Sequence, residues 1–114
     1  MIKLLQWLIR IAGLGALVLG LMLSRIPILN LHMILGCIVV LALAILALWA
    51  LAVRVRIPAA IAGLFWATAT IYVGMMKNRG TMGEIVHVLL GIGAIGLAEM
   101  LAGALARKRA SLTA

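Results

Sequence analysis

Two histidines are the residues of this sequence best suited to chemistry. Each is followed four positions later by a glycine, in the segments His32-Met33-Ile34-Leu35-Gly36 and His87-Val88-Leu89-Leu90-Gly91. A residue four positions along a helix lies one turn further on and on nearly the same face. Each imidazole would therefore stand beside a position that has no side chain. Neutral imidazole is a common metal ligand, so the repeated pattern predicts one ligand shared between two helices.

The composition indicates where those helices lie. Hydrophobic residues make up 68% of the 114 residues, charged residues make up 11%, and the mean hydropathy is +1.34. Apolar runs long enough to cross a bilayer recur four times. Because alternating barrel patterning is absent, we expect helical spans in a single transmembrane domain over residues 1–114.

The predicted spans cover about residues 4–23, 31–53, 57–76 and 84–106. Asn30 is the expected N-cap of the second span, and Pro58 is well placed at the start of the third. The basic run Arg107-Lys108-Arg109 is expected to end the fourth. The single cysteine, Cys37, lies inside an apolar run and has no partner for a disulfide.

The cations predict the orientation of the chain. Seven fall on one side of the predicted spans (Lys3, Arg10, Arg54, Arg56, Arg107, Lys108 and Arg109) and three on the other (Arg25, Lys77 and Arg79). This bias predicts an all-α, up-down-up-down four-helix bundle with both termini in the cytoplasm. It also accounts for the net charge of +8, so we expect no nucleic-acid partner.

Haem is the ligand that this arrangement favours. With that topology, His32 and His87 lie at the same depth in the outer leaflet, on the second and fourth spans. These spans are expected to face each other across the bundle diagonal, with axes roughly 11–14 Å apart. Two imidazoles reaching inward would leave room for an iron ion, and Gly36 and Gly91 would give space to a flat macrocycle. The outer cations Arg25, Lys77 and Arg79 are expected to pair with its propionates.

Other metal sites fit the sequence less well. Glu84-x-x-His87 matches half of a di-iron bundle site, but the chain has only one further carboxylate, Glu99, and we discard this alternative. Five methionines towards the outer end leave copper open, and also leave open a methionine as one axial haem ligand. These are Met22, Met33, Met75, Met76 and Met82.

Two ionisable groups lie well inside the predicted spans from the opposite side. Arg10 and Glu99 would be costly alone in lipid, so we expect a contact between them across helices. The contact is interpreted first as an ion pair for helix packing, and second as a proton-accepting carboxylate beside a quinone. Four residues of the third span either line a quinone pocket or pack in the bundle, and packing is favoured: Trp66, Thr68, Thr70 and Tyr72.

The histidine segments His32-x-x-x-Gly36 and His87-x-x-x-Gly91 resemble the ligand helices of small bis-histidine b-type membrane cytochromes. The resemblance covers about half of the chain and implies one haem b with His32 and His87 as axial ligands. It also implies electron exchange with a quinone or with partner redox subunits. The better-known members have more helices and often a second haem.

We therefore expect an integral, multi-pass protein of the bacterial cytoplasmic membrane that acts as an electron-transfer or anchor subunit of an oxidoreductase. Lipid, other membrane or redox subunits and, as an open alternative, a quinone are the expected partners. No nucleophile–base pair or phosphate loop indicates hydrolysis or phosphoryl transfer. The alternative from another class is a cofactor-free packing subunit of a larger complex, or a small transporter.

Overall fold

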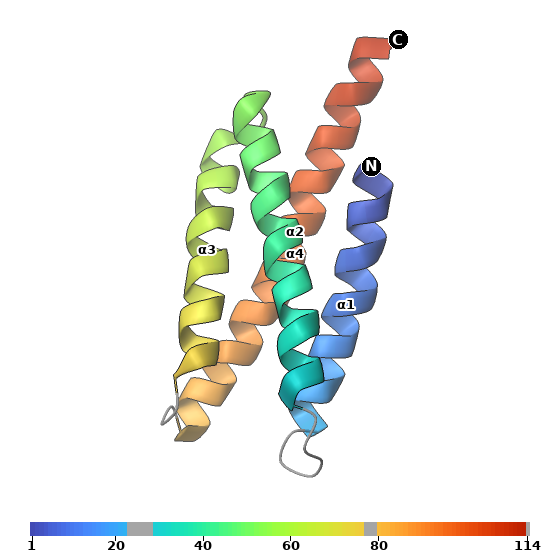
Figure 1. Ribbon diagram of the computed structural model, residues 1–114. Coiled ribbons are helices and arrows are strands. Elements are labelled where there is room, and N and C mark those ends of the chain that lie inside the picture. Colours follow the sequence, from blue (N-terminus) through green and yellow to red (C-terminus); the bar gives the residue numbers. More distant parts are fainter. Residues whose placement is uncertain (23–28, 77–79, 114) are drawn as a thin grey trace.

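Four helices make up the part of the chain that the structure describes. The computed structural model describes residues 1–22, 29–76 and 80–113, and Figure 1 shows its four helices side by side. They are α1 (Ile2–Met22), α2 (Leu29–Ala52), α3 (Ile57–Met75) and α4 (Gly80–Thr113). All four are long and apolar enough to cross a membrane. The prediction of an all-helical, multi-pass membrane protein is confirmed.

The helix lengths match the thickness of a bilayer. The first three helices contain 21, 24 and 19 residues, which at the α-helical rise gives lengths of roughly 29–36 Å. The hydrocarbon core of a bilayer is about 30 Å thick. α4 contains 34 residues, and its C-terminal end extends beyond the other helices in Figure 1.

The ends of two helices differ from the sequence prediction. α4 begins at Gly80 and continues through Arg107, Lys108 and Arg109 to Thr113, so the basic run does not end it. Lysine and arginine are good helix formers, and charge ends the apolar span without ending the helix. α2 begins at Leu29, which places Asn30 inside the helix and not at its N-cap.

The turn between α2 and α3 is tight and hydrogen-bonded. Val55 donates its backbone N–H to Ala50 (2.8 Å), which closes the C-terminus of α2. Arg54 and Arg56 adopt left-handed backbone conformations, with φ of 56° and 45°. Arg56 precedes α3, and Pro58 occupies the first turn, as the sequence predicted.

Successive helices alternate in direction, and both termini lie at the same end of the bundle (Figure 1). Each helix contacts the next along the chain, and α1 also contacts α4. α2 and α4 contact each other as well, whereas α1 and α3 do not within the described residues. α2 and α4 therefore contact each other directly across the bundle. The separation of roughly 11–14 Å between their axes stays a prediction.

The packed core occupies only one half of the bundle, at the end that carries the termini. The largest fully buried side chains are Ile9, Leu43, Leu46 and Leu101, with small residues such as Ala47 and Ala98 between them. Small residues let membrane helices approach closely, which explains the direct contact of α2 with α4 at this level.

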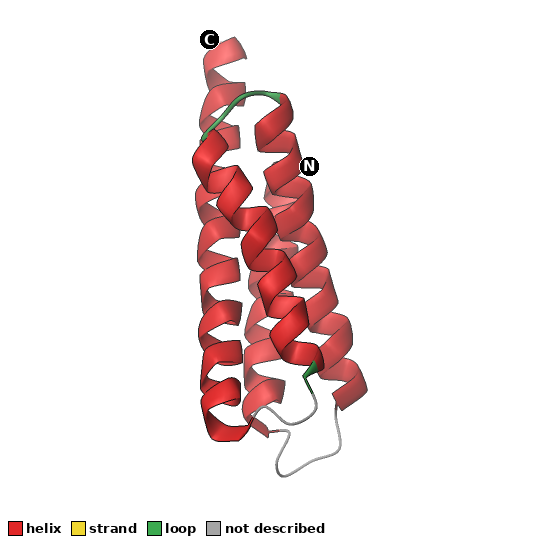
Figure 2. Cartoon of the chain, turned by 90° about the vertical axis from the view of Figure 1, so that its left-hand side faces the viewer, coloured by secondary structure: helices red, strands yellow, loops and turns green. Residues whose placement is uncertain are grey.

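The opposite half, which contains both histidines, is built differently. Within the described residues, no buried position lies in α1 after Gly13, in α2 before Val39, in α3 after Thr70 or in α4 before Ala94. Figure 2 shows the helices continuing as a bundle through this half. The histidine-bearing half therefore has the helices but not the packed interior.

Candidate functional site

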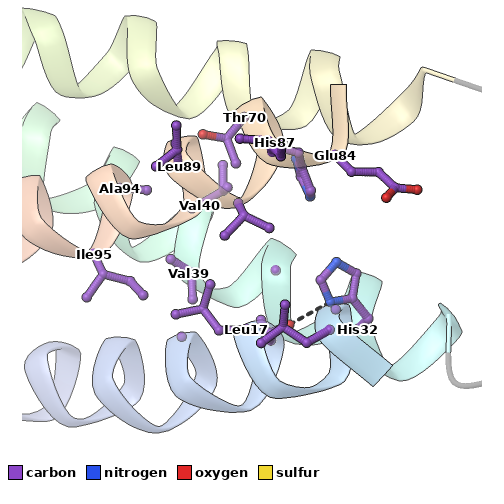
Figure 3. Close-up of a pocket in the computed structure, with 18 residues that line it drawn as sticks. Leu17, His32, Val39, Val40, Thr70, Glu84, His87, Leu89, Ala94 and Ile95 are labelled. Carbon is purple, nitrogen blue, oxygen red and sulfur yellow. Dashed lines mark hydrogen bonds between the residues drawn. The ribbon is translucent and has the colours of Figure 1, made fainter. Parts of the chain in front are cut away.

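The two imidazoles meet inside the bundle. His32, near the start of α2, and His87, near the start of α4, have ring centroids 6.1 Å apart and ring planes inclined at 71°. Figure 3 shows the two side chains pointing toward one another. The parallel course of α2 and α4 explains the common level, because both histidines lie in the first third of helices that start at the same end of the bundle.

His32 is held by the backbone of α1. Its Nδ1 lies 2.8 Å from the carbonyl oxygen of Ala16 (dashed line in Figure 3). A carbonyl only accepts hydrogen bonds, so Nδ1 carries the proton in this contact. In a neutral ring the other nitrogen, Nε2, then has its lone pair available to a metal ion.

Gly20 makes this contact sterically feasible. A Cβ at Gly20 would lie 2.9 Å from Cε1 of His32 and 3.4 Å from its Nδ1. Gly20 is one turn beyond Ala16 on α1, so its bare face lets the imidazole approach the Ala16 carbonyl. The ring is thereby fixed against the helix that precedes its own.

His87 packs against a glycine of α3 in the same way. A Cβ at Gly74 would lie 2.8 Å from Cε1 of His87 and 3.5 Å from each of its ring nitrogens. In each helical hairpin, a glycine near the C-terminal end of the first helix thus packs against the histidine of the second helix.

A cavity of about 610 Å³ adjoins the two rings. Its walls come from α1, α2 and α4, with Thr70 as the contribution of α3. The volume lies within the range of cofactor and ligand sites in proteins. Apolar and small residues line most of it, so a bound group would be shielded from water.

Gly36 and Gly91 both line this cavity. A Cβ at Gly36 would meet nothing within 4 Å, and one at Gly91 would meet only Leu17 at 3.9 Å. Gly36 and Gly91 therefore do not pack against the imidazoles. They border open space beside them, where larger side chains would reduce the cavity.

Two further polar residues line the cavity. Thr70 is buried, and its hydroxyl donates to the Trp66 carbonyl at 2.8 Å. Glu84 is exposed, one turn before His87, and in Figure 3 its carboxylate points away from the two rings. The imidazoles are thus the principal polar groups that the described residues direct into the cavity.

The described methionines do not support copper. Met33, Met75, Met76 and Met82 are each at least 44% exposed, and none of them lines the cavity. Among the described residues, no group of three His, Cys, Asp or Glu side chains lies together. The cations proposed for the propionates, Arg25, Lys77 and Arg79, lie outside the described residues.

The predicted contact between Arg10 and Glu99 is confirmed. Arg10 donates from Nε to Oε1 of Glu99 at 2.6 Å and from Nη2 to Oε2 at 3.1 Å. Gln6 donates to Oε2 at 3.3 Å, a contact that the sequence analysis missed. Its position one turn before Arg10 was the available signal. The cluster joins α1 to α4 in the packed half, away from the histidine cavity.

Trp66 packs between helices, as favoured from the sequence, and does not line the cavity. Its Nε1 donates to the Leu90 carbonyl at 2.7 Å. The indole lies directly against Gly93, where a Cβ would come within 2.8 Å of Nε1. Glycine here exposes a helix backbone to an aromatic N–H, as Gly20 does for His32.

The sequence analysis also missed Ala16, Gly20 and Gly74. The available signal was a glycine near the C-terminal end of each helix that precedes a histidine helix. Glycine is common in membrane helices, so that signal is weak without coordinates.

Comparisons with protein-family models, with curated proteins and with solved structures give no significant match to this chain.

Proposed function

We propose that this protein is a membrane b-type cytochrome subunit in which His32 and His87 are the axial ligands of one haem b. The observation that carries the proposal is the 6.1 Å between the ring centroids. Imidazole nitrogens bind first-row metal ions at about 2 Å, which places the centroids of two axial rings roughly 6 Å apart. The 71° between the ring planes is compatible with ligation of one metal ion from opposite sides, because the bond between a metal ion and an imidazole nitrogen sets no particular angle between the planes of two such rings.

The hydrogen-bonding of His32 supports the same proposal. Ligating histidines usually donate their other ring N–H to a carbonyl or carboxylate, which fixes the tautomer and the ring orientation. The contact of Nδ1 with the Ala16 carbonyl has this character. The cavity beside the rings, with Gly36 and Gly91 on its wall, supplies space for a macrocycle.

The bound haem would supply one-electron redox chemistry. The chain supplies the two imidazoles, their orientation and a site lined mainly by apolar side chains. By sequence, Arg25, Lys77 and Arg79 belong to the connections nearest the site, and we assign to them the charge pairing with the propionates.

The physiological role that follows is electron transfer or anchoring within a larger oxidoreductase, without catalysis by this chain itself. The partners are other membrane or redox subunits and, as a lipid-soluble alternative, a quinone. We place both termini in the cytoplasm of a bacterial cell, because six exposed cations lie in α1, α4 and the α2–α3 turn at the end that carries the termini: Lys3, Arg54, Arg56, Arg107, Lys108 and Arg109.

A reduced-minus-oxidised spectrum of the purified protein tests the haem proposal. The protein is produced with a haem precursor in the medium, beside His32→Ala, His87→Ala and the control Cys37→Ala. Cys37 is exposed and lies outside the cavity lining. We expect a low-spin b-type spectrum in the parent and the control, and its loss in both histidine variants.

Two results would contradict the proposal. A colourless parent that also binds no haem on titration would favour the cofactor-free packing subunit or small transporter. A low-spin spectrum that survives in one histidine variant would assign that axial position to another residue.

A further inference from the structure

We call the line of contact between two neighbouring helices a seam. The seam between α1 and α4 is closed by side-chain contacts in the packed half of the bundle. The bidentate pair of Arg10 with Glu99 joins the two helices, with a shortest distance of 2.6 Å. Just beyond it, Gly13 lies so close to Ile95 that a Cβ would be 2.6 Å from its Cδ1. Neither lipid nor ligand could pass between α1 and α4 at this level.

The seam between α1 and α2 is closed at the level of the cavity. The imidazole of His32 contacts both Ala16 and Gly20 across it. One turn deeper, a Cβ at Gly15 would be 3.0 Å from Leu35. On the other side of the bundle, His87 rests on Gly74 and Trp66 on Gly93, which closes α3 against α4.

The seam between α1 and α4 opens at the cavity. Gly91 and Leu17 approach only to ordinary contact, with 3.9 Å from a Cβ at Gly91 to Leu17. Beyond them, two residues that line the cavity from α1 and α4 also face outward: Leu21 is 72% exposed and Ile85 49%. Figure 3 shows Leu17 on α1 (blue) at the edge of the cavity opposite His87 and Ala94 on α4 (orange). An apolar opening thus connects the cavity with the outer surface of the bundle, at a level that faces lipid.

We propose that the cavity exchanges its ligand with the hydrocarbon phase of the bilayer through this opening, defined by Leu17, Leu21 and Ile85. Apart from Glu84, which precedes Ile85, the rim is apolar and faces lipid, so a flat, largely apolar molecule dissolved in the bilayer could pass it without being hydrated again. The proposal rests on the proposed function only for the identity of that ligand, haem b. The route itself rests on the packing of the three seams.

Carbene labelling tests the route without any cofactor. The apoprotein in phospholipid vesicles is irradiated with an aryl diazirine dissolved in the bilayer, and adducts are mapped by mass spectrometry. Val39 and Val40 line the cavity and are 5% and 7% exposed, whereas Leu43 and Leu46 on the same helix are 0% exposed and lie outside it. We expect adducts at the two valines, and about tenfold fewer at the two leucines, because of these four residues only the valines line the cavity that the opening reaches.

Side chains placed in the opening should block it. In Leu21→Trp combined with Ile85→Trp we expect the adducts at Val39 and Val40 to fall about tenfold, which corresponds to about 1.4 kcal/mol. Leu41→Trp is the control, because Leu41 is 62% exposed on α2 and does not line the cavity. Ile85→Phe alone gives a milder block that keeps the test valid where the double variant does not fold.

The outcomes separate the route from the haem. Labelling of the valines by a charged, water-soluble diazirine, with none by the bilayer-dissolved reagent, would overturn the proposal in favour of access from the end of the bundle. Equal labelling of valines and leucines would also overturn it. Haem uptake from haem-loaded vesicles should slow about tenfold in the blocked variant. The carbene labelling is measured on the apoprotein, so a failure of haem binding would not be mistaken for a failure of the route.

Discussion

At the scale of single residues, the histidine site depends on glycines in the neighbouring helices. His32 and His87 each rest on a glycine of the preceding helix, Gly20 and Gly74. The glycine that follows each histidine by one turn instead borders open space, as Gly36 shows most clearly. Two kinds of glycine therefore serve one site, one by close contact and the other by leaving room.

Gly20→Ala and Gly36→Ala separate these two roles. Alanine raises the helix propensity equally in both, but only at Gly20 would the new methyl group come within 2.9 Å of the His32 ring. We expect Gly20→Ala to displace the imidazole from the Ala16 carbonyl and to weaken haem binding about 10–100-fold. Haem titration followed by absorbance measures this.

Gly36→Ala is expected to bind haem within a few-fold of the parent protein. Gly74→Ala should reproduce the loss through His87, because the new Cβ would be 2.8 Å from its Cε1. If haem titrations of both Gly20→Ala and Gly74→Ala match that of the parent protein, the contacts with these glycines do not orient the two histidines.

At the scale of the helices, the packed half is held by specific contacts between neighbours. Arg10, Glu99 and Gln6 connect α1 with α4, and Trp66 connects α3 with α4. Arg10 and Glu99 keep 51% and 30% of their side chains exposed, so their pairing is not sealed inside the bundle. In lipid an unpaired charge at this depth is costly, which gives the pair a structural role.

Removing one partner of this ion pair should lower the stability of the bundle more than removing both partners. Glu99→Gln leaves Arg10 without a carboxylate, and we expect a loss of about 1 kcal/mol in the stability of the bundle. The double variant Arg10→Leu, Glu99→Leu should recover part of the loss, because neither charge remains in lipid. Unfolding in mixed micelles measures both.

In the same variants, the haem spectrum and quinone turnover distinguish a structural role of the Arg10–Glu99 pair from a proton-accepting role of Glu99. We expect it to be unchanged in Glu99→Gln, since the cluster is not part of the cavity lining. A shift of quinone turnover in Glu99→Gln without any loss of stability would contradict the structural role and would favour the proton-accepting role.

Gly93→Ala and Gly96→Ala test the contact between α3 and α4. A Cβ at Gly93 would come within 2.8 Å of Nε1 of Trp66, whereas a Cβ at Gly96 would meet nothing within 4 Å. We expect Gly93→Ala to displace the indole, break its bond to Leu90 and lower the unfolding midpoint. The free energy of unfolding should fall by about 1–3 kcal/mol, the usual effect of adding a methyl group to a well-packed interior.

Gly96→Ala, on the same helix, is expected to leave the midpoint unchanged or raise it slightly through helix propensity. Equal midpoints for the two variants would indicate that the indole finds another position at no cost.

At the scale of the whole molecule, the bundle divides into a packed half and a half with a cavity. Small residues and Leu43, Leu46 and Leu101 fill the half near the termini, and both imidazoles lie in the other. Rigid packing at one end and an apolar opening at the other would allow ligand exchange without loss of the fold. The exposed cations of α1, α4 and the α2–α3 turn gather at the packed end.

Cysteine labelling of the whole molecule tests its orientation. In a Cys37→Ala background, Arg56→Cys and Ser111→Cys are expected to react with a membrane-impermeant maleimide only after the cells are opened, because the positive end stays inside. Labelling of either position on intact cells would reverse the orientation. Asn78→Cys, which in the sequence falls between α3 and α4, is the complementary control and is expected to react from outside.

The sequence by itself predicted four helices, the membrane location and the Arg10–Glu99 contact. It also predicted the histidines at a common level, where their rings come within 6.1 Å. These follow from the length of apolar runs, from the cost of unpaired charge in lipid and from helical geometry. It did not predict the full length of α4, since basic residues end an apolar span while continuing a helix.

Only the tertiary structure decided which faces meet. Lipid and the interior of a membrane bundle are equally apolar, so hydropathy does not distinguish an inward leucine such as Leu43 from an outward one such as Leu41. Steric fit makes that choice, and fit is a property of two surfaces together. The contacts of the histidines with Gly20 and Gly74, the direct contact of α2 with α4 and the opening between α1 and α4 all follow from it.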